Sequence, residues 1–135
     1  FKNMLFNKTD KILIHDAARP FITQDLISRL FSELETAEAV FPKIPISDAL
    51  WYKSENSFNK GPARDLLFRA QTPQGFYFEQ IKNLYKNNNE THLDDISIAQ
   101  SHKLKISGIL GDPINIKLTT PEDLTFAEMV SKIWM

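Results

Sequence analysis

No cysteine occurs among the 135 residues of this chain. Disulfide bonds, thiolate catalysis and cysteine-ligated zinc sites are therefore excluded for this sequence. Long apolar runs are missing too. None approaches the roughly 20 residues that cross a bilayer, and no basic-then-apolar N-terminus marks an export signal. We therefore expect a cytoplasmic protein with no membrane partner.

An excess of either charge is also lacking, because 16 lysines and arginines face 17 acidic residues and leave a formal net charge of -1. Proteins that neutralise many phosphates of a nucleic acid usually carry a basic surplus, so we expect no nucleic-acid partner. Glycine is scarce, with 4 residues, and no segment resembles a Gly-rich phosphate-binding loop. Apolar residues make up 42% of the chain, which suffices for the core of one α/β domain.

The first third of the chain shows a strand, a helix and a second strand. The β-branched run 11–15 predicts a buried strand, and residues 37–41 predict another that Pro42 and Pro45 close. Between them, Thr23 is expected to cap a helix whose apolar residues follow the 3.6-residue period: Leu26, Ile27, Leu30, Phe31 and Leu34. This order is typical of a parallel sheet.

The middle of the chain predicts a hairpin-like arm. Residues 46–53 look extended, 54–61 form a polar loop, and 66–71 look extended again. Three aromatic residues lie on or near this arm: Trp51, Tyr52 and Phe58. Aromatic side chains on a protruding arm usually pack against a partner, so we favour a contact between subunits over packing on the parent domain.

The last part of the chain predicts a return to alternating elements. In order, we expect a turn, a helix, a short helix, two strands and a final helix, over residues 72–75, 76–86, 94–103, 105–110, 114–118 and 120–134. The final helix has the strongest local signal, because a capping Thr120 precedes Pro121 and two acids. Asp94 and Asp95 could bind a metal, but acids at a helix start usually interact with its dipole, and we favour that interpretation.

Two charged residues stand where an α/β fold can bind ligands. Asp16 directly follows the first predicted strand, and such sheets bind ligands outside the carboxyl ends of their strands. Its carboxylate could hold Mg²⁺ or a sugar hydroxyl, or bond to amides of its own turn, and its position favours neither. Arg64 precedes the returning limb of the arm. Its guanidinium matches a phosphate, although a lone arginine at an arm tip is more commonly solvated.

Other polar residues give weaker indications. Lys117 could stabilise a phosphate as a point charge, but an edge-strand lysine that blocks strand pairing is the favoured interpretation. Thr72 offers a hydroxyl and a nearby amide, yet it is most simply a turn residue. Three histidines show neither metal-ligand spacing nor a paired acid or nucleophile in sequence, which disfavours a metallohydrolase or a Ser-His-Asp enzyme: His15, His92 and His102.

Three segments, in the same order, resemble one known family. They are 12–20 (ILIHDAARP), 69–76 (RAQTPQGF) and 115–124 (NIKLTTPEDL). The family is that of the 2-C-methyl-D-erythritol 4-phosphate cytidylyltransferases of non-mevalonate isoprenoid biosynthesis, and the resemblance extends from about Lys11 to the end of the chain. It implies a Rossmann-like nucleotidyltransferase sheet with helices on both faces, and a homodimer interlocked by the arm at about 46–67.

The resemblance also implies a reaction and its residues. Methylerythritol phosphate would attack the α-phosphorus of CTP and release pyrophosphate, with Mg²⁺ bound mainly through the CTP phosphates. Such catalysis relies on positioning and charge stabilisation. The implied catalytic residues are Arg64, which grips the substrate phosphate in the partner subunit's site, and Lys117, which orients that phosphate. The implied substrate-binding residues are Asp16, Ala17, Arg19 and Thr72, and no residue is implied as a metal ligand.

The chain also departs from the family pattern. Ala49 and Leu93 stand where the family often has threonine, which removes two contacts with substrate hydroxyls. The family's Gly-rich phosphate loop would precede Phe1. We therefore expect residues 1–135 to be the C-terminal part of one cytidylyltransferase domain, incomplete at the N-terminus and inactive in isolation. Two alternatives stay open: a non-catalytic dimerising fragment of that enzyme, and another sugar-phosphate nucleotidyltransferase.

Overall fold

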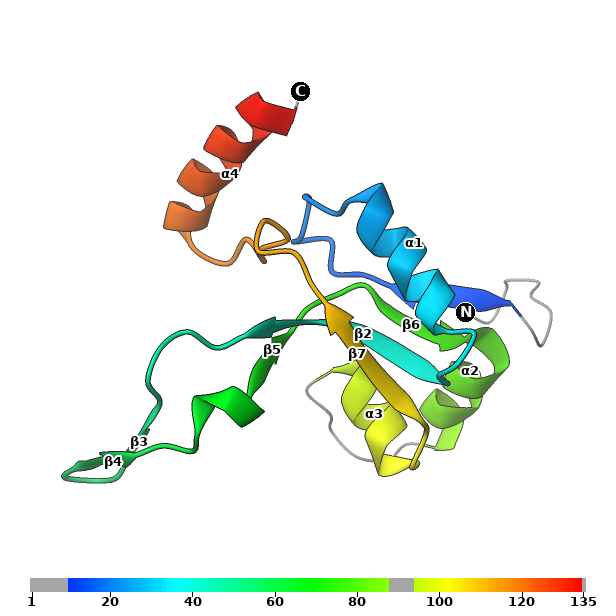
Figure 1. Ribbon diagram of the computed structural model, residues 1–135, viewed down its shortest axis with the longest axis horizontal. Coiled ribbons are helices and arrows are strands. Elements are labelled where there is room, and N and C mark those ends of the chain that lie inside the picture. The colour runs from blue at the N-terminus through cyan, green and yellow to red at the C-terminus, as the bar shows by residue number, and fades with distance from the viewer. Residues whose placement is uncertain (1–9, 88–93, 135) are drawn as a thin grey trace.

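Five strands of the molecule form one mixed sheet in a computed structural model that describes residues 10–87 and 94–134 (Figure 1). They are β1 (Lys11–Ile14), β2 (Ala39–Pro45), β5 (Phe68–Ala70), β6 (Gln74–Tyr77) and β7 (Ile106–Leu110). β6 lies between β1 and β2 and pairs antiparallel with both. β2 also pairs antiparallel with β5 and parallel with β7, so β2 is the centre of the sheet.

Helices cover both faces of this sheet, as expected. α1 (Gln24–Glu33) lies on one face, and α2 (Phe78–Asn87) and α3 (Asp95–Ser101) lie on the other (Figure 1). Adjacent strand residues point to opposite faces and so divide the core in two. Toward α1 the buried residues are Leu26, Leu30, Leu34 and Val40. Toward α2 and α3 they are Ala39, Phe76, Ile81, Leu84, Ile96, Ile98 and Ala99.

The starts of two helices follow the sequence signals. Thr23 caps α1, because its side-chain oxygen accepts a hydrogen bond from the Leu26 amide at 3.1 Å. Asp94 caps α3 in the same way, with its Oδ1 accepting from the Ser97 amide at 2.9 Å. The helix-start interpretation of the acid pair is therefore confirmed for Asp94.

The predicted arm is also present. It projects from the sheet and ends in an antiparallel hairpin of β3 (Trp51–Lys53) and β4 (Phe58–Lys60), which pair only with each other (Figure 1). A short 3-10 helix, η1 (Arg64–Leu66), leads back toward β5. The regular strands are shorter than the extended segments predicted from sequence, and all residues of β3 and β4 are exposed.

The prediction of a turn at 72–75 followed by a helix from residue 76 was wrong, because residues 74–77 form β6. Gly75 explains the error. It was interpreted as a turn residue, but it lies buried in the sheet, where an added Cβ would stand 2.8 Å from Val40 and 3.0 Å from Leu13. The glycine therefore allows close packing rather than a turn, and the helix begins two residues later, at Phe78.

This misplaced strand also changes the expected sheet. The strand-helix-strand order of β1, α1 and β2 was interpreted as a parallel sheet. Because β6 is antiparallel to both strands, β1 and β2 do run in the same direction, but they are not neighbours. β2 continues through Pro42, which was expected to end it, since the Pro42 carbonyl still accepts a hydrogen bond from the Gln71 amide at 2.8 Å.

The strand predicted over 114–118 is absent. Residues 111–119 follow an irregular path that the side chain of Asp112 and backbone turns stabilise. The interpretation of Lys117 as an edge-strand lysine was therefore wrong.

The final helix, α4 (Pro121–Trp134), forms where it was predicted. Asp123 Oδ2 accepts hydrogen bonds from the Thr119 and Thr120 amides, at 2.8 Å each. α4 projects away from the sheet (Figure 1) and exposes several large apolar residues, namely Leu124, Phe126, Met129 and Ile133. Within residues 10–87 and 94–134, no helix has the length and apolar character needed to span a membrane.

Candidate active site

A tight turn after β1 brings an acid and a base together. The Asp16 carbonyl accepts a hydrogen bond from the Arg19 amide at 3.0 Å, which closes a four-residue turn with exposed Ala17 near its tip. The Arg19 Nε then lies 3.5 Å from Asp16 Oδ2. Aspartate at the first position of such a turn often bonds to turn amides, but here its carboxylate contacts charged side chains.

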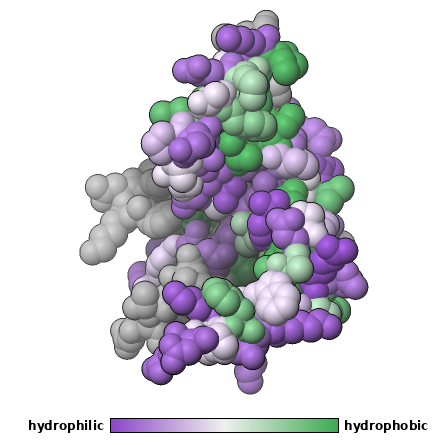
Figure 2. Space-filling model, turned by 90° about the vertical axis from the view of Figure 1, so that its left-hand side faces the viewer, coloured by the Kyte–Doolittle hydropathy of each residue, from purple (hydrophilic) through white to green (hydrophobic). Residues whose placement is uncertain are grey.

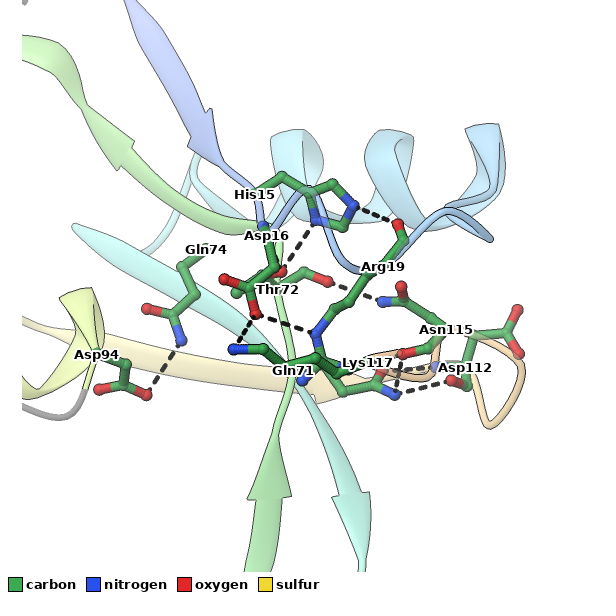
Figure 3. A network of polar contacts seen from close by, with 10 residues as sticks. All are labelled: His15, Asp16, Arg19, Gln71, Thr72, Gln74, Asp94, Asp112, Asn115 and Lys117. Atoms are coloured by element: carbon green, nitrogen blue, oxygen red, sulfur yellow. Dashed lines mark hydrogen bonds and ion pairs between the residues drawn. The ribbon is translucent and has the colours of Figure 1, made fainter. Parts of the chain in front are cut away.

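Lys117 joins this pair from a distant part of the sequence. Its Nζ lies 3.1 Å from Asp16 Oδ2, as Figure 3 shows. The backbone fixes this approach, because the Leu118 amide donates to the Ala18 carbonyl at 2.8 Å. The structure thus brings together three of the residues that the sequence singled out, from both ends of the chain.

Thr72 lies beside the same turn. Its Oγ1 accepts a hydrogen bond from the Asp16 amide at 3.0 Å and also lies 3.0 Å from His15 Nδ1. The other ring nitrogen of His15, Nε2, lies 2.9 Å from the Arg19 carbonyl oxygen. Thr72 therefore does more than form a turn: its hydroxyl joins the end of β1 to the segment between β5 and β6 (Figure 3).

Two buried amide side chains fix the remaining backbone. The side chain of Asn115 donates from Nδ2 to the Thr72 backbone carbonyl at 2.7 Å. The backbone carbonyl of Asn115 accepts from Arg19 Nη1 at 2.8 Å and from Gln71 Nε2 at 3.1 Å. Gln71 also donates to the Asp112 carbonyl at 2.9 Å and accepts from the Asp112 amide at 3.2 Å. These bonds hold residues 112–117 against the sheet and so determine where Lys117 can reach.

The charges at this site favour an ionised Asp16. Burial alone would raise the pKa of the Asp16 carboxyl, but the hydrogen bond and charge of Lys117 and the charge of Arg19 outweigh it. The pKa therefore lies below its ordinary value. An ionised carboxylate offers only hydrogen-bond acceptors, which suits the hydroxyl groups of a polyol.

A cavity of about 300 Å³ adjoins the cluster and carries more positive than negative side chains. It is lined by Arg19, Ile44, Arg69, Ala70, Gln71, Pro113, Ile116, Lys117, Thr119 and Asp123. Seen from the side of the arm, the surface is hollowed near its centre, where hydrophilic residues lie beside hydrophobic ones (Figure 2). Three basic side chains against one acid favour an anionic ligand such as a phosphate.

Asp123 is the acid of this cavity. Hydrogen bonds from the backbone amides of Thr119 and Thr120 hold the pKa of Asp123 below its ordinary value. The carboxylate is thus engaged with the start of α4. Its charge still partly offsets the basic lining of the cavity.

The single chain does not bring Arg64 to this cluster. Its side chain donates a hydrogen bond to the Ser47 carbonyl within the arm. It also lines a second cavity of about 270 Å³ that only arm residues 49–51 and 60–64 form. Arg64 is therefore the one candidate catalytic or substrate-binding residue that lies apart from the others.

The described residues contain no cluster of three protein ligands for a metal ion. Between 10 and 87 and between 94 and 134, no three His, Asp or Glu side chains come together as a metal site. Asp16 has the right ligand chemistry, but its carboxylate already pairs with Lys117 and Arg19.

Sequence reasoning missed four residues of this site. His15 was set aside because no partner adjoins it in sequence, although it directly precedes Asp16 at the strand end. Arg69, Gln71 and Asn115 were noted only as parts of the segments that resemble the family. Asn115 could have been found as an amide within an apolar segment, because a buried amide must find hydrogen-bond partners. His92 and Leu93 lie outside the described residues.

Comparison with known proteins identifies the family to which these features belong. Residues 3–132 match the family model described as 2-C-methyl-D-erythritol 4-phosphate cytidylyltransferase. The enzyme of that name from Roseobacter denitrificans is 42% identical over 128 residues, which are 94% of this chain and 58% of that protein. A bifunctional IspD/IspF enzyme from Ruegeria sp. is 36% identical over 93% of this chain and 33% of its own length.

Solved structures agree with this match. The cytidylyltransferase from Thermus thermophilus superposes with a TM-score of 0.83 at 26% identity, covering 90% of this chain and 62% of that one. The synthase from Anaerococcus prevotii gives the same score and identity over 95% and 61%. The nucleotidyltransferase-like α/β fold expected from the sequence is thus confirmed. This chain spans about three fifths of the length of the Roseobacter, Thermus and Anaerococcus proteins and a third of the bifunctional enzyme, and it belongs to the 2-C-methyl-D-erythritol 4-phosphate cytidylyltransferase family.

Proposed function

We propose that the full-length protein transfers CMP from CTP to 2-C-methyl-D-erythritol 4-phosphate and releases pyrophosphate, in non-mevalonate isoprenoid biosynthesis. The observation that carries this proposal is the cluster of Asp16, Arg19 and Lys117 beside a cavity rich in basic side chains. A polyol phosphate presents both hydroxyl groups and a phosphate, and the cluster offers a carboxylate for the former and cations for the latter.

The proposed reaction forms one bond and breaks another. A phosphate oxygen of methylerythritol phosphate bonds to the α-phosphorus of CTP. The bond from that phosphorus to the oxygen shared with the β-phosphorus breaks, and this oxygen leaves as a terminal oxygen of pyrophosphate. The protein needs no covalent intermediate, because alignment and charge stabilisation lower the barrier. Lys117 orients the attacking phosphate. Asp16, Ala17 and Thr72 bind the polyol part of the substrate, and Arg19 contributes a further cation for its phosphate.

Arg64 has a place in this proposal only with a second subunit. We propose a homodimer in which the arm, at about 46–67, brings Arg64 to the substrate phosphate in the partner subunit's site. The exposure of Trp51, Tyr52 and Phe58, at 63%, 60% and 69%, supports such a contact, because aromatic side chains are enriched in interfaces.

The proposal also concerns magnesium, the extent of the domain and the location of the protein. Because Asp16 is engaged with two cations, Mg²⁺ would be held mainly by the phosphates of CTP, where it would neutralise their charge. We further propose that residues 1–135 form the C-terminal part of one cytidylyltransferase domain in a cytoplasmic enzyme.

The test is a panel of substrates with the full-length protein and Mg²⁺. Release of pyrophosphate is measured for each nucleoside triphosphate with methylerythritol phosphate, and for CTP with hexose phosphates. We expect turnover with CTP and methylerythritol phosphate. Turnover with a hexose phosphate instead would indicate another sugar-phosphate nucleotidyltransferase. No CTP binding by calorimetry, from a protein that still dimerises, would indicate a non-catalytic dimerisation module.

A further inference from the structure

His15 makes two hydrogen bonds whose roles can be assigned from their partners. Its Nε2 faces the carbonyl oxygen of Arg19 at 2.9 Å, and a carbonyl oxygen can only accept. Nε2 must therefore carry a proton and donate it. In a neutral imidazole the other nitrogen, Nδ1, then has no proton and accepts.

The hydroxyl of Thr72 is fixed in turn by His15. In this neutral tautomer, the Thr72 hydroxyl donates its proton across the 3.0 Å between Oγ1 and Nδ1. The Asp16 amide, at 3.0 Å, occupies one lone pair of the same oxygen. A hydroxyl has one proton and two lone pairs, so these two contacts leave one lone pair of the half-buried Thr72 Oγ1 unused.

This arrangement makes Thr72 selective for the kind of group it can meet. With its proton committed to His15, the hydroxyl can accept a hydrogen bond but has none to donate. It therefore suits the hydroxyl of a polyol, which can donate, and not a phosphate oxygen, which can only accept. Phosphate would instead find its donors at Lys117, Arg19 and Arg69, which line the adjoining cavity.

We propose that His15 is a positioning residue that holds the Thr72 hydroxyl as a hydrogen-bond acceptor for a substrate hydroxyl. The position of the two ring nitrogens between Arg19 and Thr72 carries this inference. The identity of the substrate rests on the proposed function, whereas the orientation of the hydroxyl does not. His15 acts through Thr72 and does not itself contact the reacting atoms.

The first test measures the protonation of the two ring nitrogens of His15 by NMR and requires no activity assay. In full-length protein labelled with ¹⁵N-histidine, we expect the Nε2 signal of His15 in the protonated range and the Nδ1 signal in the unprotonated range. Thr72→Val should shift the Nδ1 signal because it removes the hydroxyl donor, and Thr72→Ser should leave that signal near its original position. A proton on Nδ1, or no response to Thr72→Val, would overturn the proposal.

The second test separates positioning from structural support with two variants of His15. Asparagine places an acceptor near the position of Nδ1, and glutamine places a donor near that of Nε2. His15→Gln should therefore raise the KM for methylerythritol phosphate about five- to tenfold with a smaller change in kcat. His15→Asn should retain most of the affinity. Equal losses in the two variants would show only structural support and would contradict the proposal.

The same experiments include a control variant, and they separate a failure of the proposed function from a failure of the proposal about His15. His102→Gln changes an exposed histidine at the end of α3, and it should alter neither the His15 signals nor the KM. If the full-length protein has no cytidylyltransferase activity, the proposed function fails, while the ¹⁵N signals and their response to Thr72→Val still decide the orientation of the hydroxyl.

Discussion

At the scale of single residues, the site depends on one carboxylate shared by two cations. Asp16 Oδ2 lies 3.1 Å from Lys117 Nζ and 3.5 Å from Arg19 Nε. The acid holds both bases beside the cavity and partly neutralises them. Arg69 lines the cavity without contributing to this pairing. The balance leaves a positive cavity next to a hydrogen-bond acceptor, which is the combination that a polyol phosphate requires.

The lowered pKa of Asp16 predicts a dependence of stability on pH. A carboxyl whose pKa is lower in the folded than in the unfolded protein stabilises the fold fully above its ordinary pKa of 3.8. That stabilisation is lost as the pH falls below 3.8 through the folded-state pKa. The free energy of unfolding of Asp16→Asn, measured by urea denaturation, should therefore lack this acid-side component.

The matched control for this prediction is Asp48→Asn, which removes an exposed carboxylate on the arm. The free energy of unfolding of Asp48→Asn should depend on pH in nearly the same way as that of the wild type. If Asp16→Asn shows the same dependence of unfolding free energy on pH as the wild type across the acid range, the ion pairs of Asp16 do not stabilise the fold.

At the scale of elements, β6 is the strand that sequence interpretation missed and that the sheet needs most. It joins β1 to β2 and carries the buried Phe76 and Gly75 in its interior. Its N-terminal residue Gln74 is also buried, and the amide of Ile96 donates to Gln74 Oε1 at 2.9 Å. β6 therefore links the sheet to the start of α3.

Gly75→Ala is expected to destabilise the protein by about 1–3 kcal/mol, because the new Cβ would meet side chains of the tightly packed core. Urea denaturation of the full-length protein measures this change. Gly108→Ala in β7 is the control, since its Cβ would first meet the flexible side chain of Lys43 at 3.0 Å. Equal stability of the two variants would contradict the close packing around Gly75.

The elements that could be predicted are those whose signals are local. The cap at Thr23 and the Thr120-Pro121 start of α4 follow from a few adjacent residues, and both helices form where expected. β6 could not be found in this way. The segment 73–75 at its start resembles a turn in isolation, and only side chains from β1, β2 and the C-terminal cap of α1 explain the glycine.

The same limit applies to the site. Asp16, Lys117 and Thr72 were selected for their positions at element ends and by resemblance, and the structure brings them together. The pairing of His15 with Thr72 joins residues 57 positions apart, so no local pattern contains it. The irregular course of 111–119 also depends on hydrogen bonds of the buried amide side chains of Gln71 and Asn115. Secondary-structure propensities of single residues do not include such long-range hydrogen bonds.

At the scale of the whole molecule, two parts extend from the sheet and expose apolar side chains. They are the arm and α4 (Figure 1). The exposed residues at the tip of the arm include Trp51, Tyr52 and Phe58, and aromatic side chains are enriched in interfaces. In the proposed dimer the arm of each subunit serves the other's site, which explains why Arg64 lies apart from Lys117 in one chain.

This assembly predicts that active sites can be restored by mixing subunits. Arg64→Ala and Lys117→Ala should each be nearly inactive in the full-length protein, because each removes a cation from the substrate phosphate. Refolding the two variants together should restore part of the activity, since one site of a mixed dimer would hold both cations. Mixtures no more active than the separate variants would contradict exchange of the arm.

Disruption of the arm gives an independent check of the assembly. The double variant Trp51→Ser, Phe58→Ser removes two exposed aromatic residues of the β3–β4 hairpin and should shift the protein from dimer to monomer in analytical ultracentrifugation. Leu124→Ser, which removes an exposed apolar residue of α4, should leave the dimer intact. A dimer that survives the double variant would place the subunit contact elsewhere.

The central claim is that the basic cavity beside Asp16 is the site of cytidylyl transfer. Its most direct test is the initial rate of pyrophosphate release from CTP and methylerythritol phosphate by the full-length protein and by Lys117→Met, which keeps most of the length of the side chain but removes its charge. We predict a rate about 100-fold lower in this variant, with Lys132→Met on α4 unchanged. A Lys117→Met enzyme as fast as the wild type would contradict the claim.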